Sequence, residues 1–338
     1  METENILAEM REAIDSELKK IINETIQNYP AEYVSMLNYQ LGWEGDGSNQ
    51  SAQGKRIRPM LVLLACQGVG GDWHKALPAA AAVELVHNFS LIHDDIQDCS
   101  ELRRGRPTVW VKWGNAQAIN AGDAMLTLSH LAILRLSDFL NDSDVLKAVE
   151  MTQTACLKLT RGQHLDIAFE DKDDLPMDLY WKMVEGKTGA LLAACLSLGA
   201  LCGNASNPII KSLYDIGIKI GNAFQVQDDW LGIWGDNEVT GKSCTSDLSA
   251  KKKTYPILLG IHHGKDFCKA WKSMDEIDGK AAAELANLLE AEGHQTATKE
   301  MFEQLYHDGF GELTALPCNA EKLQPLIDVL QGLFGRIK

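Results

Sequence analysis

The sequence of 338 residues contains no CxxC pair and has few basic residues for its length. Its eight cysteines are scattered, so neither the ligand spacing of a structural zinc site nor a disulfide framework is present. Lysine and arginine number 32 against 47 acidic residues, a net charge of −15, which argues against binding to nucleic acid or to anionic lipid. We therefore expect a cytoplasmic protein with an acidic surface.

Targeting and membrane-spanning segments are lacking as well. The N-terminal "METENILAEM" is too acidic and too polar for a signal or transit peptide. The most apolar stretch, "TGALLAACLSLGALCG" (188–203), is uncharged but shorter than the roughly 20 apolar residues that a spanning helix needs. Its composition predicts a helix that is buried on all sides, with other helices close against it. We expect no integral membrane association.

Sustained alternation of apolar and polar residues, the pattern of half-buried strands, is scarcely found, whereas helical periodicity is common. Eight apolar residues near the N-terminus recur at steps of three and four and predict one helical stripe: Ile6, Leu7, Met10, Ile14, Leu18, Ile21, Ile22 and Ile26. No interdomain linker and no repeat of fixed period interrupts the chain. The sequence thus predicts a single all-α domain spanning residues 1–338.

The stretch "LIHDDIQDCSELRRGRP" (91–107) concentrates opposed charges directly after an apolar run. On a helix the carboxylates of Asp94 and Asp98 share one face, and Asp95 lies about 100° around the axis. Like charges at this spacing destabilise a helix unless a cation lies between them, and Mg²⁺ prefers a few carboxylates completed by water and phosphate oxygens. Taken alone, the motif fits a solvated helix end equally well.

A second acidic pair, Asp228 and Asp229, ends the apolar helical segment "FQVQDDWLGIWGD" (224–236), with Asp236 further on. Short basic groups accompany the two acidic clusters: "GKRIRP" (54–59), "RRGRP" (103–107), "GKTG" (186–189), "GK" (241–242) and "KKKT" (251–254). Each basic group alone is typical of a solvated loop. Together with metal-binding carboxylates they are what a diphosphate needs, because its charge can be shared between metal, guanidinium and ammonium groups.

In these motifs the sequence resembles the trans-isoprenyl diphosphate synthases, the polyprenyl synthetase family that includes farnesyl and geranylgeranyl diphosphate synthases. The resemblance covers nearly the whole chain, in the family's order and spacing, through "GKRIRP", "ELVHNFSLIHDDIQD", "LRRGRPT", "AGDAML", "RGQHLD", "EGKTGAL", "FQVQDD" and "GKSCTSDLSAKKKTYP". It implies an antiparallel helical bundle of the isoprenoid synthase type around a deep central cavity, usually as a homodimer. It also implies an enzyme that condenses isopentenyl diphosphate with dimethylallyl, geranyl or farnesyl diphosphate.

The resemblance assigns roles to individual residues. It implies a cluster of Mg²⁺ ions, three per active site and replaceable by Mn²⁺, held by Asp94, Asp95, Asp98, Asp228 and Asp229. It places four residues on the allylic diphosphate, namely Arg103, Lys187, Lys242 and Lys252. It places another four on isopentenyl diphosphate, namely Lys55, Arg58, His87 and Arg104. Thr188 and Gln225 would face the developing allylic cation, and with Lys187 and the five aspartates they form the expected catalytic set.

The expected chemistry follows from these charges. Metal ions and cationic side chains stabilise the departing diphosphate, so that the C–O bond ionises to an allylic cation in a site closed to water. Isopentenyl diphosphate attacks that cation, and loss of a proton leaves a chain five carbons longer. No protein nucleophile is needed, which agrees with the lack of any Ser/His/Asp or Cys/His arrangement in the sequence.

The second acidic motif departs from the family's usual DDxxD, because Gly232 takes its fifth position. Asp228, Gly232 and Asp236 instead have the i, i+4, i+8 spacing of the second metal motif in class I terpene cyclases. A cyclase has no use for a second diphosphate pocket, and a non-catalytic regulatory subunit would normally have lost some acidic residues, so the synthase is favoured over both. We expect the substitution Gly232→Asp to be tolerated.

Product length is expected to depend on Phe89 and Ser90, the fifth and fourth residues before Asp94. In the resembled family a bulky fifth residue acts as a floor that stops elongation, and a small fourth residue leaves room beside it. One large and one small residue predict a partial floor, with a twenty-carbon product favoured and a fifteen-carbon product next. The alternative is that Phe89 is simply a core aromatic residue.

Overall fold

The computed structural model describes residues 2–170, 172, 175–235, 246–274 and 276–334. The chain forms two compact units. The first comprises residues 1–156, 194–211 and 318–326, and the second comprises residues 157–193, 212–317 and 327–338. The single domain expected for residues 1–338 stays a prediction.

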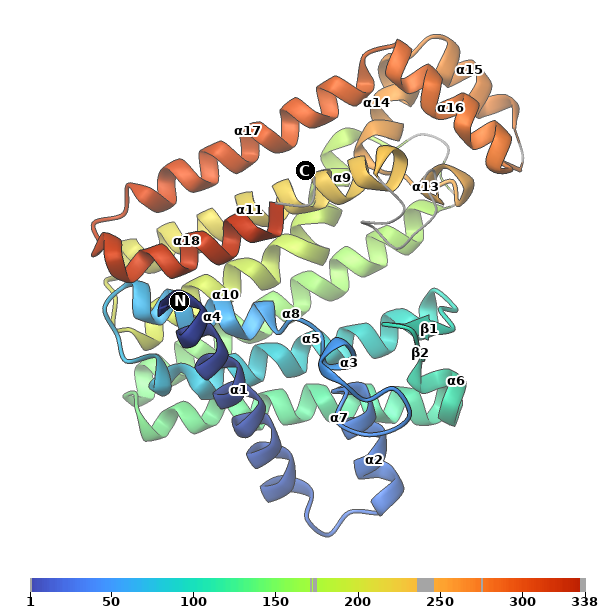
Figure 1. The fold of residues 1–338 in the computed structure, drawn as a ribbon. Coiled ribbons are helices and arrows are strands. Elements are labelled where there is room, and N and C mark those ends of the chain that lie inside the picture. The colour runs from blue at the N-terminus through green and yellow to red at the C-terminus, as the bar shows by residue number, and fades with distance from the viewer. Residues whose placement is uncertain (1, 171, 173–174, 236–245, 275, 335–338) are drawn as a thin grey trace. The chain divides into compact units, whose positions relative to one another are not determined.

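Helices account for nearly all of the regular structure (Figure 1). The first part of the chain forms α1 (Glu2–Ile26), α2 (Ala31–Gln40), α3 (Gln50–Gln53), α4 (Ile57–Gly68), η1 (Trp73–Ala76), α5 (Leu77–Gln97), β1 (Leu102–Arg103), β2 (Arg106–Pro107), α6 (Val109–Trp113), α7 (Asn115–Leu134) and η2 (Arg135–Asp138). The rest forms α8 (Asp142–Glu170), α9 (Met177–Val184), the π-helical turn η3 (Glu185–Gly189), α10 (Ala190–Cys202), α11 (Asn207–Trp234), α13 (Ser246–Ser249), α14 (Tyr255–His263), α15 (Asp266–Ser273), α16 (Gly279–Ala291), α17 (His294–Thr314) and α18 (Ala320–Phe334).

The apolar stripe predicted near the N-terminus is confirmed in α1. Six of its members are buried: Met10, Ile14, Leu18, Ile21, Ile22 and Ile26. Through them α1 packs against α4, α5 and α7. Because burying each such side chain contributes about 1.5–3 kcal/mol, this face fixes the helix on the first unit.

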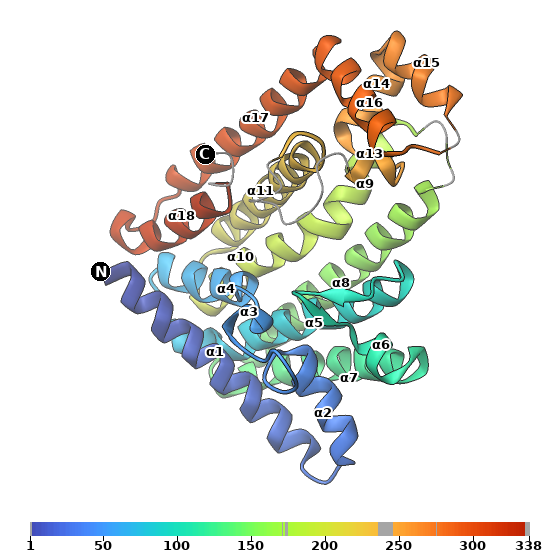
Figure 2. The same cartoon turned by 45° about the vertical axis from the view of Figure 1, so that its right-hand side comes forward.

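The most extensive helix pairing in the first unit joins α5 to α7, which run side by side (Figure 2). A proline near its start and the alanines of 79–82 favour helix in α5. The helix stops where Cys99 adopts a φ of +50° and the N–H of Ser100 donates to the carbonyl of Asp95 at 2.9 Å, as in a Schellman cap. The acidic motif therefore lies at the C-terminal end of α5, where the helix dipole disfavours negative charge.

A short antiparallel hairpin follows α5, and helical periodicity gave no sign of it. Strands β1 and β2 pair Leu102 with Pro107 and Arg103 with Arg106. The two residues between them, Arg104 and Gly105, have φ values of +54° and +74°, as a tight two-residue hairpin turn requires. Within the described residues this hairpin is the only sheet, so the all-α prediction holds.

The core of the second unit includes Tyr180, Phe267 and Leu289, all fully buried. Helices α14, α15 and α16 contact one another, and α17 packs on α14 and α16 (Figure 2).

Helix α10, predicted from its small apolar residues, has every described residue buried. Among the described residues, Met177–Cys202 is the one helix long and apolar enough to cross a bilayer, and 89% of its most apolar window is buried, as in a core helix.

Candidate active site

The first acidic motif has the arrangement expected from its spacing. Asp94 and Asp95 lie in the last turn of α5, and Asp98 caps it by donating its N–H to the carbonyl of Asp94 at 2.8 Å. The side chain of Asp94 is 21% exposed and that of Asp95 only 2%, while Asp98 is exposed. The first and third carboxylates thus reach solvent, and the second is buried.

Asp95 is held by the hairpin that follows it. Arg103 donates from Nε to both carboxylate oxygens of Asp95, at 2.8 and 2.9 Å, and its Nη2 lies 2.6 Å from Oδ1. The same Nη2 lies 3.6 Å from Asp94. Burial raises the pKa of Asp95, against the opposing effect of Arg103. The structure therefore brings Arg103, predicted to bind the allylic diphosphate, onto the first acidic motif.

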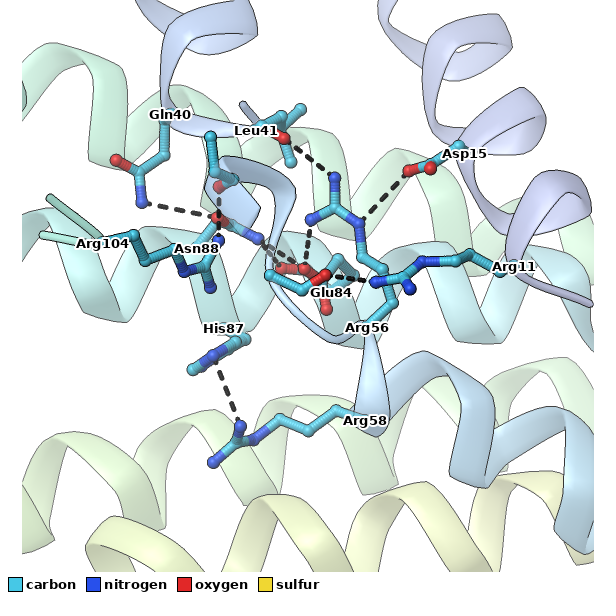
Figure 3. A network of polar contacts seen from close by, with 12 residues as sticks. Arg11, Asp15, Gln40, Leu41, Arg56, Arg58, Glu84, His87, Asn88 and Arg104 are labelled. Carbon is cyan, nitrogen blue, oxygen red and sulfur yellow. Dashed lines mark hydrogen bonds and ion pairs between the residues drawn. The ribbon is translucent and has the colours of Figure 1, made fainter. Parts of the chain in front are cut away.

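Three of the four residues predicted for isopentenyl diphosphate come together in the first unit (Figure 3). Nη1 of Arg58 lies 3.3 Å from Nε2 of His87, and Arg104 donates to the carbonyl of Ala52 at 2.9 Å. The buried Nε of Arg58 has no hydrogen-bond partner among the described residues, so a donor remains for an anion. Lys55, the fourth residue, is exposed.

His87 is electrically neutral in this surrounding. Burial lowers its pKa well below the usual value, and the positive charges of Arg58, Arg104, Arg103 and Arg56 lower it further. Because a guanidinium can only donate, Nε2 must accept from Arg58, which assigns the ring proton to Nδ1. A neutral imidazole can therefore lie among these arginines without adding to their repulsion.

Sequence reasoning missed Arg56, which anchors the "GKRIRP" segment from inside (Figure 3). Its fully buried guanidinium donates to Glu84 at 2.6 Å, to Asp15 at 3.2 Å and to the carbonyl of Leu41 at 2.9 Å. The backbone at Arg56 is left-handed, with φ +50°. No local pattern predicts these three partners, because they come from three other segments of the chain.

Glu84 lies on α5, so its ion pair with Arg56 connects the "GKRIRP" segment to this helix. Asn88, one turn further along α5, donates to the Glu84 carboxylate at 3.0 Å and to its carbonyl at 2.8 Å. His87 occupies the neighbouring position on the same helix. The Arg56–Glu84 pair thus fixes the segment that carries Lys55 and Arg58 against the helix that carries His87.

In the second unit, Lys187 and Thr188 lie in the π-helical turn η3, a structure often found at functional sites. A Cβ on Gly162 of α8 would lie 2.2 Å from the backbone N of Lys187, so glycine is needed for α8 and η3 to approach. Nζ of Lys187 lies 2.5 Å from Oδ2 of Asp166. Both Gly162 and Asp166 belong to "RGQHLD", whose partners the sequence did not reveal.

Thr188, Gln225 and Asp229 are connected by hydrogen bonds. The hydroxyl of Thr188 donates to Oε1 of Gln225 at 2.8 Å, and Nε2 of Gln225 donates to Oδ1 of Asp229 at 3.0 Å. Oδ2 of Asp229 accepts from the Tyr180 hydroxyl at 2.7 Å and from the backbone N–H of Tyr255 at 2.9 Å. Burial raises the pKa of Asp229 to about 7, and these hydrogen bonds oppose the rise. Sequence reasoning missed Tyr180.

The tolerance of Gly232→Asp stays a prediction, but the structure adds a neighbour that bears on it. A Cβ at Gly232 would lie 2.1 Å from Oδ2 of Asp247. An aspartate here would place a second carboxylate against that of Asp247, so we now expect Gly232→Asp to be disfavoured. Asp247 also lies 3.4 Å from Lys252, one of the predicted diphosphate ligands.

Two positions from the sequence analysis, Lys242 and Asp236, lie outside the described residues. Asp228 is partly buried on α11. Phe89 and Ser90 lie about one turn before Asp94 on α5, as expected. The ring of Phe89 is 6% exposed and meets that of His93 edge-on at 5.0 Å, and Ser90 donates to the carbonyl of His87 at 2.8 Å. The effect of Phe89 on product length stays a prediction.

The carboxylates fit a metal that arrives with its substrate. Within the ranges that the structure describes, no group of three or more His, Cys, Asp or Glu side chains could hold a metal ion. Mg²⁺ commonly takes only one or two protein carboxylates and completes its octahedron with water and substrate phosphates. Asp94 and Asp98, which share a helix end and reach solvent, are of this kind.

Comparison with known proteins agrees with this geometry. The family model described as "Polyprenyl synthetase" matches residues 47–291. A (2E,6E)-farnesyl diphosphate synthase of Mycobacterium tuberculosis is 43% identical over 268 residues, covering 78% of this chain and 70% of the relative. A geranylgeranyl diphosphate synthase of the same organism is 37% identical over 314 residues, covering 92% and 85%.

A solved structure gives the same result for the fold. The geranylgeranyl pyrophosphate synthetase of Pyrococcus horikoshii superposes with a TM-score of 0.88 at 29% identity, covering 99% of each chain. The all-α fold is thus that of the isoprenoid synthases. With the family match over most of its length, the chain belongs to the polyprenyl synthetase family of prenyltransferases.

Proposed function

We propose that this protein is a Mg²⁺-dependent synthase that condenses isopentenyl diphosphate with an allylic diphosphate, with geranylgeranyl diphosphate as its main product. The observation that carries the proposal is the presence of two separate groups of basic side chains along α5. Arg58, His87 and Arg104 gather near its middle, and Arg103 meets the acidic motif at its end. His87 precedes Asp94 by seven residues, about 10 Å along a helix, which suits two separate diphosphates.

In this proposal the acidic motifs serve the allylic substrate. Asp94, Asp98 and Asp228 are assigned as carboxylate ligands for Mg²⁺, and Asp95 and Asp229 are their neighbours in the two motifs. When bound, Mg²⁺ would neutralise negative charge on the departing diphosphate. Four cationic residues are assigned to the same diphosphate: Arg103, Lys187, Lys242 and Lys252. Asp166 and Asp95 hold Lys187 and Arg103 in fixed orientations.

The second substrate is assigned to the other basic group. Lys55, Arg58, His87 and Arg104 bind isopentenyl diphosphate and orient its double bond toward the allylic carbon. Neutral His87 and the unpartnered Nε of Arg58 are consistent with a site that keeps hydrogen-bonding capacity for an anion. Thr188 and Gln225 present oxygen atoms to the allylic cation, and fixed dipoles of this kind stabilise charge without reorganising.

Product length is the finer part of the proposal. Phe89, buried one turn before Asp94, is assigned as a partial floor, with Ser90 leaving room beside it. A twenty-carbon product is favoured, and farnesyl diphosphate is the next choice. The relatives include synthases named for each of these products.

We also propose a cytoplasmic homodimer. Four large apolar side chains of α7 and the segment after it are 42–50% exposed: Ile119, Leu131, Leu134 and Phe139. Three of the four lie on α7, and exposed apolar surface on one element is typical of a contact with another protein. Sedimentation of the purified protein at micromolar concentration tests this part.

The experiment that tests the function compares Arg58→Ala with Lys187→Ala in steady-state kinetics. The first should mainly raise the KM for isopentenyl diphosphate, and the second should chiefly weaken the allylic substrate. Equal effects of both changes on both substrates would contradict the division into two diphosphate sites. A wild type that releases cyclic hydrocarbon from an allylic diphosphate alone would show a terpene cyclase instead.

A further inference from the structure

The second aspartate of the second motif is enclosed by protein groups. Asp229 is 4% exposed and accepts hydrogen bonds from Tyr180, from the backbone N–H of Tyr255 and from Gln225. Its neighbour Asp228 is only partly buried. Adjacent carboxylates in one motif therefore have different surroundings, which suggests different tasks.

We propose that Asp229 is a positioning residue that, held by Tyr180, fixes the amide orientation of Gln225 and thereby the direction of the Thr188 hydroxyl. The inference rests on the proposed function, since it concerns the groups that would face the allylic cation. It assigns metal binding in the second motif to Asp228.

The donor and acceptor capacity of each group fixes the orientation of the Gln225 amide. The backbone N–H of Tyr255 can only donate, so Oδ2 of Asp229 is an acceptor, and the Tyr180 hydroxyl donates to the same atom. The other oxygen, Oδ1, meets the side-chain amide of Gln225 at 3.0 Å. In the structure the NH₂ group of Gln225 points toward this oxygen and donates to it.

The orientation of the Gln225 amide determines whether Thr188 turns its hydroxyl proton or its oxygen lone pairs toward the allylic cation. With its NH₂ group on Asp229, Gln225 turns Oε1 toward Thr188, whose hydroxyl must then donate its proton at 2.8 Å. The remaining lone pairs of the Thr188 oxygen, together with the amide oxygen, form a negative edge suited to a cation. With the amide reversed, its NH₂ group would point at Thr188, and the edge would carry positive partial charge.

The test exchanges the donor and acceptor between the two positions. In Asp229→Asn, an amide faces the Gln225 amide. We expect kcat to fall about 10- to 100-fold, less than the roughly 100- to 1,000-fold cost of removing an oriented polar group outright, because Thr188 and Gln225 are still present. Adding Gln225→Glu restores a hydrogen bond in the opposite direction. The NH₂ group of the asparagine at position 229 can donate to the glutamate at position 225, while the oxygen of that asparagine still accepts from the N–H of Tyr255. The kcat of the double variant should exceed that of Asp229→Asn by at least about tenfold.

Two further measurements separate positioning from metal binding and from simple packing. Half-saturating Mg²⁺, and the Mg²⁺-dependent binding of an unreactive allylic thiolodiphosphate measured by calorimetry, should stay within about threefold of wild type in Asp229→Asn. Both should weaken about tenfold in the matched control Asp228→Asn, which loses a predicted ligand. Tyr180→Phe, which keeps the ring, should reproduce a milder kcat loss with Mg²⁺ dependence unchanged.

Three outcomes would overturn the inference. One is a Mg²⁺ requirement that rises as much in Asp229→Asn as in Asp228→Asn. Another is a double variant that unfolds at the wild-type temperature but recovers no activity. The third is a wild type without prenyl transfer, which would overturn the proposed function together with this inference, whereas the first two leave that function standing.

Discussion

The Arg56–Glu84 ion pair should contribute strongly to stability, and Glu84→Gln tests this. The side chain of Arg56 is fully buried and that of Glu84 is 3% exposed, with 2.6 Å between Nη1 and Oε1. Among the described residues, removing the charge of Glu84 leaves the more distant Asp15, at 3.2 Å, as the one carboxylate paired with the buried guanidinium. Breaking a buried pair in this way costs about 3–5 kcal/mol. Because glutamine keeps the shape and one acceptor, we expect the lower end, about 3 kcal/mol.

The assay is thermal and urea unfolding followed by far-ultraviolet circular dichroism. An exposed pair in the same chain provides the matched control, since Asp178 and Lys182 are 65% and 56% exposed at 3.1 Å. Asp178→Asn should change the free energy of unfolding by no more than about 0.5 kcal/mol. Glu84→Gln should lower the midpoints clearly and also raise the KM for isopentenyl diphosphate, because the segment with Lys55 and Arg58 loses its anchor. Midpoints equal to those of Asp178→Asn would refute the reasoning.

Three shorter predictions concern pH, the second motif and product length. The pKa of His87 is lowered in the folded protein, so its imidazole takes up a proton in the unfolded chain first as the pH falls below about 6.5. The free energy of unfolding of wild type should therefore fall by up to about 1.4 kcal/mol per pH unit more than that of His87→Gln. Parallel stability curves of the two proteins from pH 7 to 5 would contradict this. Gly232→Asp should lower both activity and melting temperature because its Cβ would meet Asp247, and the exchange Gly232→Asp with Asp247→Gly should recover part of the loss; a single variant as stable and active as wild type would show that Asp247 moves aside freely. Phe89→Ala should lengthen the products, with Leu85 as the next limit, and an unchanged length distribution by mass spectrometry would place the floor elsewhere.

The sequence predicted the features that depend on local periodicity and on motif spacing. The stripe of α1, the buried α10 and the shared helix end of Asp94 and Asp98 follow from intervals of three and four residues. Such intervals report which face of a helix is apolar, and the structure agrees.

Partners from distant segments could not be predicted in the same way. Glu84 reaches Arg56 across 28 positions, and Tyr180 reaches Asp229 across 49. Gly232 shows the consequence most directly, because comparison with the usual motif alone suggested a tolerated aspartate, whereas Asp247 lies where its Cβ would go. The hairpin after α5 was missed because two residues per strand are too few for a periodic signal.

The most direct test of the proposed function is product analysis of the wild-type protein. Purified enzyme is incubated with Mg²⁺, farnesyl diphosphate and isotopically labelled isopentenyl diphosphate, and the products are dephosphorylated and identified by gas chromatography with mass spectrometry. We expect labelled geranylgeraniol that forms only when both substrates and Mg²⁺ are present. Unlabelled cyclic hydrocarbons, or no incorporation of label with any allylic diphosphate, would contradict the proposed function.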